Sequence, residues 1–136
     1  MRSLNPFKKK SDEQEVVGDI DPTELPEPSD YESFLHRGWT YNVRGEQEQA
    51  ESDFRRAISF SPESVDANFA LGLNLKYQGK KDEAVEVFTR TMEILEGGEA
   101  ERDSKTEMMR RLTLGHINEL TTGEWDLEDQ IWHRSD

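Results

Sequence analysis

Self-similarity at a fixed spacing constrains the fold of this chain more than any other feature. When the sequence is shifted by 34 residues, four positions coincide in one phase: Gly38 with Gly72, Gly45 with Gly79, Ala50 with Ala84, and Phe54 with Phe88. One such match carries little weight, but four in phase indicate two copies of the same structural unit. A unit of this length is typical of a helical hairpin that must stack on a neighbour to bury its apolar face.

The types of the repeated residues indicate close helix packing. A glycine inside a helix costs about 1 kcal/mol relative to alanine, so Gly38 and Gly72 are expected where a neighbouring helix comes too close for a Cβ atom. The repeated alanines are small for the same reason, on the second helix of each pair. The repeated phenylalanines come four residues later on the same helix face, and we expect them to fill the space beyond the close contact. Gly45 and Gly79 can take positive φ and end the first helix of each pair.

Apolar residues recur at helical spacing from Tyr31 onward, with short breaks that contain glycine. The pattern predicts helices near residues 31–44, 47–60, 64–78, 81–96 and 100–121, and a short one near 126–134 that begins after Asp126. The breaks fall at Gly45, Gly79, Gly97-Gly98 and Gly123. Alternating strand patterns and Asn-Gly hairpin signals are absent from the sequence, so the predicted fold class is all-α.

The repeated residues resemble the tetratricopeptide-repeat (TPR) family, which has the same repeat length. The positions that match the family are Gly38, Tyr41, Gly45, Ala50, Phe54, Ala57 and Pro62 in the first repeat, and Leu71, Gly72, Gly79, Ala84 and Phe88 in the second. Arg37 stands where the family has leucine, and Phe34 replaces its usual tryptophan. A degenerate third unit follows, in which the first helix, the turn and the second helix are marked by Leu114-Gly115, Gly123, Trp125 and Trp132.

The resemblance implies stacked antiparallel helix hairpins, that is, a TPR-like α-solenoid with a right-handed superhelix and about 2.5 repeats. Repeat 1 is expected at residues 31–64 and repeat 2 at 65–98. Residues 99–136 are expected to form a degenerate third repeat and a C-terminal capping helix, because an array must cover its last apolar face. Residues 1–30 are rich in proline and acidic residues and have few apolar ones, so we expect a disordered tail.

Charge and composition exclude several classes of function. The net charge is −13 and the acidic excess is spread along the chain, so nucleic acid is not expected as a partner, because phosphate binding needs a basic face. There is no cysteine, and no apolar run approaches the about 18 residues that a membrane span needs. The cluster Lys8-Lys9-Lys10 is smaller than a typical lipid-binding cluster, so membrane contact is not expected. The expected location of this acidic protein is the cytoplasm.

The resemblance also implies where a partner would bind, because the first helix of each TPR pair lines a concave groove. The corresponding positions are Leu35, Trp39, Asn42 and Val43 in repeat 1, Phe69, Leu73, Lys76 and Tyr77 in repeat 2, and Met109 and Leu112 in the third unit, with Glu32, Asp66 and His116 beside them. Aromatic side chains bury a large area with few rotors to freeze, which suits binding hot spots. We therefore predict a non-catalytic adaptor that binds another protein through an extended or helical peptide with apolar anchors.

Two alternatives stand beside this prediction. The groove is either open or occupied by the chain itself, through the segment Trp125–Trp132 folding back or the third helix packing across Leu73 and Tyr77. The alternative function is a structural or assembly role as a homo-oligomer, in which Trp125 and Trp132 pair between chains.

No residue pattern predicts catalysis, a metal site or a cofactor. His36, His116 and His133 lie on separate predicted helices without an i+4 partner, and we expect exposed histidines. Gly97-Gly98 lacks the ending of a phosphate-binding loop, and no carboxylate lies in an apolar run that would raise its pKa. The family's carboxylate clamp, which grips chaperone C-termini, would need charge at positions that hold Leu35, Trp39, Ala70, Met109 and Thr113. The chain is therefore predicted to be neither an enzyme nor a chaperone co-factor of that type.

Overall fold

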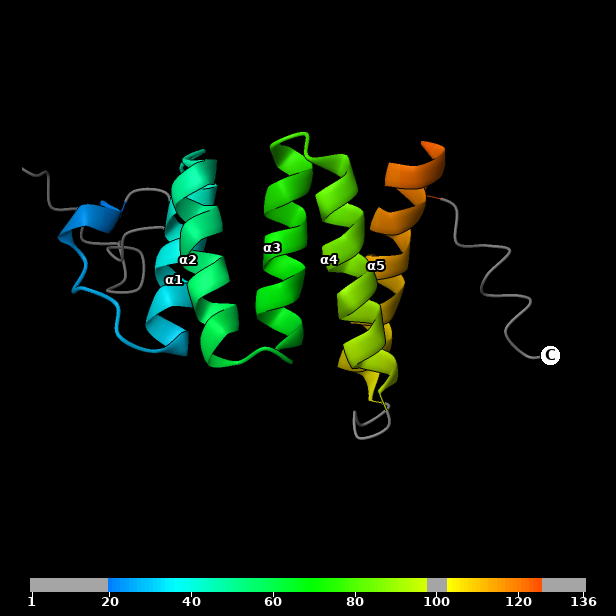
Figure 1. Cartoon of the computed structure of the whole chain (residues 1–136), viewed down its shortest axis with the longest axis horizontal. Coiled ribbons are helices and arrows are strands. Elements are labelled where there is room, and N and C mark those ends of the chain that lie inside the picture. Colours follow the sequence, from blue (N-terminus) through cyan, green and yellow to red (C-terminus); the bar gives the residue numbers. More distant parts are fainter. Residues whose placement is uncertain (1–19, 98–102, 126–136) are drawn as a thin grey trace, which may run out of the picture.

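The computed structural model describes residues 20–97 and 103–125 of the chain. Within these ranges the chain forms five α-helices and no strand, and Figure 1 shows the helices following one another along the molecule in chain order. Their bounds are α1 (Tyr31–Val43), α2 (Gln47–Phe60), α3 (Val65–Tyr77), α4 (Lys81–Glu96) and α5 (Ser104–Thr122).

Each helix packs on the next one in the chain. The pairs α1–α2 and α3–α4 form two helix hairpins, α2 packs on α3 to join them, and α4 packs on α5. This arrangement confirms the predicted all-α fold of stacked antiparallel hairpins. The bounds of α2 and α4 are those predicted, α1 ends one residue earlier than predicted, and α3 is one residue shorter at each end. The helix α5 begins later than residue 100, because the Asp103 carboxylate caps it by accepting a hydrogen bond from the Thr106 amide at 2.8 Å.

The turns inside the two hairpins share one geometry. Gly45 and Gly79 have φ of 81° and 80°, a left-handed conformation that strains residues with a side chain. The backbone amide of the residue after each glycine donates a hydrogen bond to a carbonyl in the last turn of the preceding helix. Glu46 N donates to Tyr41 O at 3.0 Å, and Lys80 N donates to Leu75 O at 2.9 Å. These bonds satisfy carbonyls that the helix end would leave unpaired, so the glycines end α1 and α3 as predicted.

The core forms where a phenylalanine ring lies on a glycine of the facing helix. A Cβ atom on Gly38 would come within 2.7 Å of Phe54, and one on Gly72 within 2.6 Å of Phe88. Both rings and both repeated alanines, Ala50 and Ala84, are fully buried. We expected the helix backbones to touch at the glycines and the rings to fill space beyond that contact. The rings themselves occupy the space that the missing Cβ atoms leave, because a flat ring fits closely against a bare Cα.

A buried ion pair joins the two helices of the first hairpin. The guanidinium of Arg37 on α1 binds both carboxylate oxygens of Asp53 on α2, at 2.8 and 2.9 Å. Asp53 is only 3% exposed, and its hydrogen bond to Arg37 raises the pKa of the guanidinium. The rings of Phe34 and Tyr41 flank the guanidinium, with centroids 6.0 and 5.8 Å from Cζ. Arg37 therefore keeps a defined role although it departs from the leucine of the family pattern.

A polar network joins the two hairpins to each other. The fully buried amide of Asn74 on α3 donates to the carbonyl oxygen of Gln47 at 3.0 Å and to its side-chain oxygen at 2.7 Å. The Glu51 carboxylate on α2 accepts hydrogen bonds from the side chains of Gln78 (2.9 Å), Lys80 (3.0 Å) and Arg55 (2.9 Å). Burial acts to raise the pKa of Glu51, but these three donors together lower it to about 2.

The described end of the N-terminal tail lies along α1. Its backbone passes from Ile20, whose carbonyl accepts a hydrogen bond from Arg44 at 3.0 Å, to Asp30, which caps α1 through the Ser33 amide. Pro22 and Pro28 are buried. The short 3-10 helix Pro22–Glu24 contacts α1. The expectation of a disordered tail over residues 1–30 stays a prediction.

Several predictions fall outside the described residues. These are the first part of the tail with Lys8-Lys9-Lys10, the glycine pair's second member at Gly98, and the short helix near 126–134 with Trp132 and His133.

Candidate functional site

The predicted partner-binding residues lie on α1 and α3, which are the first helices of the two hairpins, and on α5, and we call them the A-helix surface. Its members are Leu35, Trp39, Asn42 and Val43 on α1, Phe69, Leu73, Lys76 and Tyr77 on α3, and Met109 and Leu112 on α5. Two members contact residues of the next of these helices. Asn42 accepts a hydrogen bond from Asn74 of α3 at 3.3 Å, and the Phe69 ring lies 5.6 Å from the ring of His116 on α5.

Four members of the A-helix surface serve the fold as well. Leu35, Trp39, Phe69 and Leu73 are half-buried and pack against the core. The Trp39 ring meets Phe54 edge-on at 5.3 Å between centroids, and Phe69 meets Phe88 in the same way at 5.7 Å. Each ring is thus fixed in place by the core and keeps part of its area on the surface, which reduces the entropy that binding would cost.

Two members are exposed at equivalent positions of the repeats. Val43 ends α1 and is 54% exposed, while Tyr77 ends α3 and is 66% exposed. Single exposed apolar side chains are ordinary on protein surfaces, so it is the recurrence of these two at equivalent positions that makes them candidates for a contact surface. Because neither side chain packs in the core, both can contact a partner at little cost to the fold.

Three of the remaining members are engaged within the chain. The Lys76 ammonium binds Glu119 at 2.8 Å and lies 3.0 Å from Nδ1 of His116, so its charge is already partnered. Met109 lines a pocket of about 200 Å³ between α3, α4 and α5, together with residues that include Val65 and Leu95. Leu112 is half-buried on α5.

His116 lies among aromatic rings rather than in solvent, which corrects the expectation of an exposed histidine. Its ring stacks on Phe88 at 5.1 Å and 5°, and meets Phe69 and Trp125 edge-on. Burial first, and then the charge of Lys76, lower the pKa of His116 to about 4, against an opposing effect of Glu119. The imidazole is therefore neutral at pH 7, and because an ammonium can only donate, Nδ1 accepts the hydrogen bond from Lys76.

Trp125 folds back onto α5 after the left-handed Gly123. Its ring meets the His116 ring at 4.7 Å and 82°, and the Lys76 ammonium lies 6.0 Å from its centroid. One end of the A-helix surface is thus occupied by the chain itself, whereas Val43 and Tyr77 are exposed. Pairing of Trp125 between chains stays a prediction.

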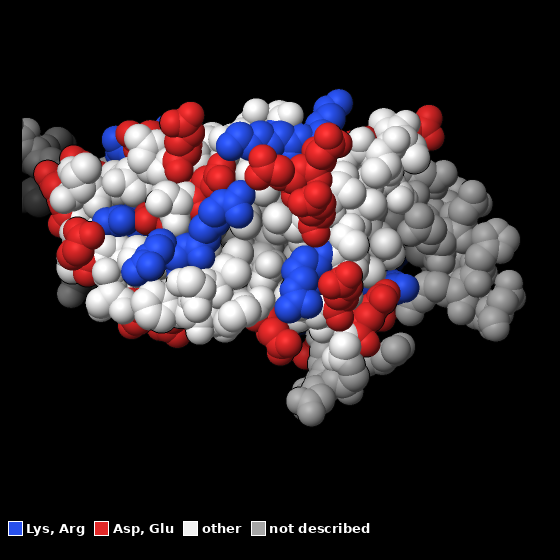
Figure 2. Space-filling view, viewed as in Figure 1, with Lys and Arg blue, Asp and Glu red and all other residues white. Residues whose placement is uncertain are grey.

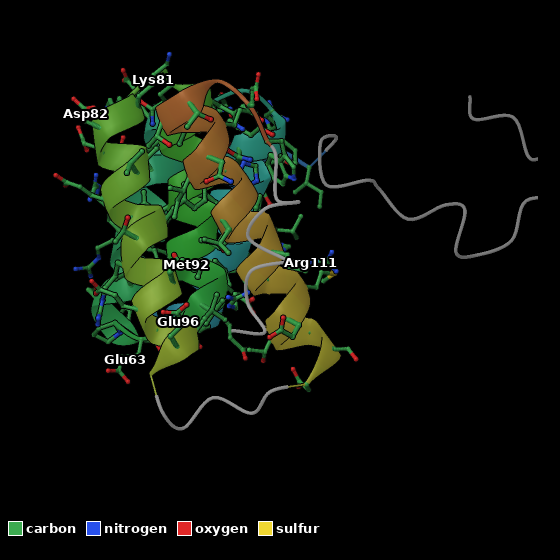
Figure 3. All side chains as sticks on the ribbon, turned by 90° about the vertical axis from the view of Figure 1, so that its right-hand side faces the viewer. Glu63, Lys81, Asp82, Met92, Glu96 and Arg111 are labelled. Carbon is green, nitrogen blue, oxygen red and sulfur yellow. The ribbon has the colours of Figure 1, made fainter. Side chains whose placement is uncertain are left out.

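The opposite side of the molecule differs in character. Figure 2 shows acidic and basic side chains interleaved over α2, α3 and α4 on the side that faces the viewer. Figure 3 places Met92 where α4 faces α5, while Lys81 and Asp82 lie at one end of α4 and Glu96 at the other. Arg55 of α2, for example, is shared between Glu51 of the same helix and Glu83 of α4. Such mixed, paired charge favours solubility over binding.

Sequence reasoning missed the contact between Trp125 and His116. A signal was present, because Gly38 and Gly72 each have an aromatic residue 16 positions later, and Gly115 has Trp125 after only 10. The different spacing concealed the relation between Gly115 and Trp125. Trp125 lies in the non-helical residues after α5, whereas Phe54 and Phe88 belong to second helices.

Residues 20–97 and 103–125 contain neither a candidate metal site nor a candidate membrane span. No group of three or more histidine, cysteine or acidic side chains there could hold a metal ion. No helix in the same ranges is long and apolar enough to cross a membrane.

Comparison with known proteins identifies the repeats. Residues 31–64 and residues 65–94 each match the family model described as tetratricopeptide repeat. No curated protein sequence matches the chain. Repeats of this family generally mediate protein–protein interaction and are typically non-catalytic. The two matches coincide with the α1–α2 and α3–α4 hairpins, and the second ends before α5. The chain therefore carries two tetratricopeptide repeats, at residues 31–64 and 65–94.

Proposed function

We propose that this protein holds a peptide segment of another protein on the A-helix surface and does not act on it chemically. One observation carries the proposal: each repeat presents a fixed, half-buried aromatic ring and an exposed apolar residue one turn or more further along. These are Trp39 and Val43 on α1, and Phe69 and Tyr77 on α3. Rings held by the core lose little freedom on binding, so they are suited to act as hot spots.

The charge of the chain favours a particular partner. Glu32 is exposed in the first turn of α1, and Asp66 is exposed in the first turn of α3, where Lys105 lies 3.9 Å from it. Lys76 is already paired with Glu119 at 2.8 Å. The net charge of −13 adds a long-range attraction for cations. The partner segment is therefore a peptide with apolar or aromatic anchors and basic flanking residues, and its association rate falls as salt rises.

Selection from a random peptide display library tests the proposal without a known partner. The wild-type chain serves as bait, and the selected peptides are then measured against Tyr77→Ala. A matched control is Phe60→Ala, which removes another half-exposed aromatic ring (50% exposed) at the end of α2, off the A-helix surface. Loss of Tyr77 is expected to weaken binding by about 1–2 kcal/mol, whereas loss of Phe60 leaves the affinity unchanged.

The two variants also separate binding from folding. Thermal unfolding should change little for Tyr77→Ala, because exposed substitutions usually shift stability by no more than about 0.5 kcal/mol. If the selected peptides bind Tyr77→Ala as tightly as wild type, or if they lose affinity equally with Phe60→Ala, the A-helix surface is not the binding surface.

A further inference from the structure

A glycine covered by an aromatic ring occurs at three places along the described array. Phe54 covers Gly38, Phe88 covers Gly72, and a Cβ atom on Gly115 of α5 would collide with the ring of Trp125. The neighbouring ring contacts match as well. Trp39, which follows Gly38, meets Phe54 at 70°, and His116, which follows Gly115, meets Trp125 at 82°. Trp125 thus takes the place of the second-helix phenylalanine in the third unit.

The three rings differ in how they are held. Phe54 and Phe88 belong to α2 and α4 and are fully buried. Trp125 follows the left-handed Gly123 outside any helix and is 37% exposed. Removing Phe54 or Phe88 from its glycine would require a whole helix to move. Trp125 belongs to no helix and is partly exposed, so of the three rings it needs the least rearrangement to leave its place.

The surroundings of Trp125 favour an aromatic occupant. The bare Cα of Gly115 leaves room for a flat ring, and the His116 ring provides an edge contact. The Lys76 ammonium lies 6.0 Å from the ring centroid, within the range of a cation–π attraction. An aliphatic side chain would make neither the edge contact nor the cation–π contact. A carboxylate would compete with Glu119, which already binds Lys76 at 2.8 Å.

We propose that Gly115, His116 and Lys76 form an aromatic subsite of the partner-binding surface, which Trp125 occupies as an internal ligand until an aromatic side chain of the partner peptide displaces it. This inference rests on the proposed function, because the subsite adjoins the A-helix surface through Lys76 and through the contact of His116 with Phe69. It adds that the partner carries a tryptophan, tyrosine or phenylalanine as one anchor, and that Trp125 lowers the affinity for it.

A small probe tests the subsite apart from any peptide. Trp125→Ala should bind N-acetyltryptophanamide with a shift of the His116 ring signals in NMR spectra, and at least tenfold more tightly than wild type does. N-acetylleucinamide is the matched aliphatic probe and should bind at least tenfold more weakly than the aromatic one. The double variant Trp125→Ala/Gly115→Ala should lose the aromatic binding, since the new Cβ fills the place of the ring.

Gly115→Ala alone provides a second measurement if Trp125→Ala does not fold. The added methyl group should expel the Trp125 ring, with a red shift of tryptophan fluorescence and loss of the His116 ring-current shift, while the helix signal in circular dichroism is kept. Unchanged fluorescence and His116 signals in Gly115→Ala, or equal binding of the two probes to Trp125→Ala, would overturn the subsite.

The outcome is distinguishable from a failure of the proposed function. If library-selected peptides depend on Tyr77 but bind Trp125→Ala no more tightly than wild type, the A-helix surface stands and the subsite is wrong. If the aromatic probe binds Trp125→Ala but the affinity of the selected peptides does not change in Tyr77→Ala, the aromatic subsite exists and the peptide-binding proposal is wrong.

Discussion

At the scale of single residues, the absence of one methyl group sets how closely α3 and α4 approach. A Cβ atom on Gly72 would lie only 2.6 Å from the Phe88 ring, which is too close for two carbon atoms. The Phe88 ring is fully buried. A glycine in a helix costs about 1 kcal/mol relative to alanine, so packing must offset that cost here. The same reasoning applies to Gly38 and Phe54.

Replacing this glycine by alanine tests the contact directly. Gly72→Ala is expected to lower the free energy of unfolding by about 1–2 kcal/mol, because overpacking costs about 1–3 kcal/mol and exceeds the gain in helix propensity. Urea unfolding followed by circular dichroism measures the change. Gly115→Ala is the control, because the ring against Gly115 belongs to the movable Trp125, and its stability should equal or exceed that of wild type. A Gly72→Ala protein as stable as Gly115→Ala would show that the ring does not rest on Gly72.

The sequence predicts that a neighbouring helix comes close at each repeated glycine. It predicts only in part which side chain makes that contact. The helical cost of Gly38 and Gly72 indicates a close neighbour whatever that neighbour is. Whether a ring or a backbone occupies the space depends on the rotation of the facing helix, which a repeat pattern does not fix. The contact of Trp125 with Gly115 was harder to predict, because Trp125 reaches Gly115 from the non-helical residues after α5 and not from a second helix.

At the scale of elements, polar contacts fix how the helices pair. Arg37 binds Asp53 through two hydrogen bonds inside the first hairpin. Replacing Arg37 by leucine, the residue of the family pattern, would leave the carboxylate of Asp53 buried without a cation. Breaking such a pair from one side typically costs about 3–5 kcal/mol, whereas replacing both partners by apolar residues is often neutral.

A double-mutant cycle follows from this asymmetry. Arg37→Leu should lower the free energy of unfolding by about 3 kcal/mol or more, and Arg37→Leu/Asp53→Leu should recover most of the loss. Chemical denaturation of the wild type, the two single variants and the double variant gives the coupling energy. Additive losses in the double variant would mean that the two side chains act independently.

The contact between the hairpins should depend on pH through Glu51. Its pKa is about 2 in the folded chain and 4.5 as an ordinary glutamate, so folding favours the charged form. The resulting stability is complete above pH 4.5 and is lost as the pH falls toward 2. Glu51→Gln should therefore lower stability at pH 7 and show a shallower fall between pH 4.5 and 2. Glu86→Gln, an exposed change on α4, is the control, and parallel pH profiles for Glu51→Gln and wild type would contradict the role of Glu51.

These polar links were beyond sequence-based prediction for a physical reason. The glycine and alanine positions indicate which helix faces meet, but Glu51 finds Gln78 and Lys80 only after α2 has packed on the turn between α3 and α4. Arg37 looked like a departure from the repeat because its partner, Asp53, lies on another helix.

At the scale of the whole molecule, two hairpins and α5 form an array covered at both described ends. Residues 20–30 lie on α1, and Trp125 lies on α5. The repeat pattern predicted the hairpins and the family, and the resemblance supplied the A-helix surface. The coverage of that surface by Trp125 could be predicted only as one of two alternatives, because Trp125 reaches Gly115 from outside any helix, at a spacing that differs from that of the other two repeats.

The measurement that tests the central claim most directly is an NMR titration of the isotope-labelled chain with a library-selected peptide. We predict that the largest shifts fall on α1, α3 and α5, at Trp39, Tyr77 and His116, and that α2 and α4 signals from Arg55 and Glu86 move little. Shifts concentrated on α2 and α4 would contradict the claim that the first helices of the repeats hold the partner.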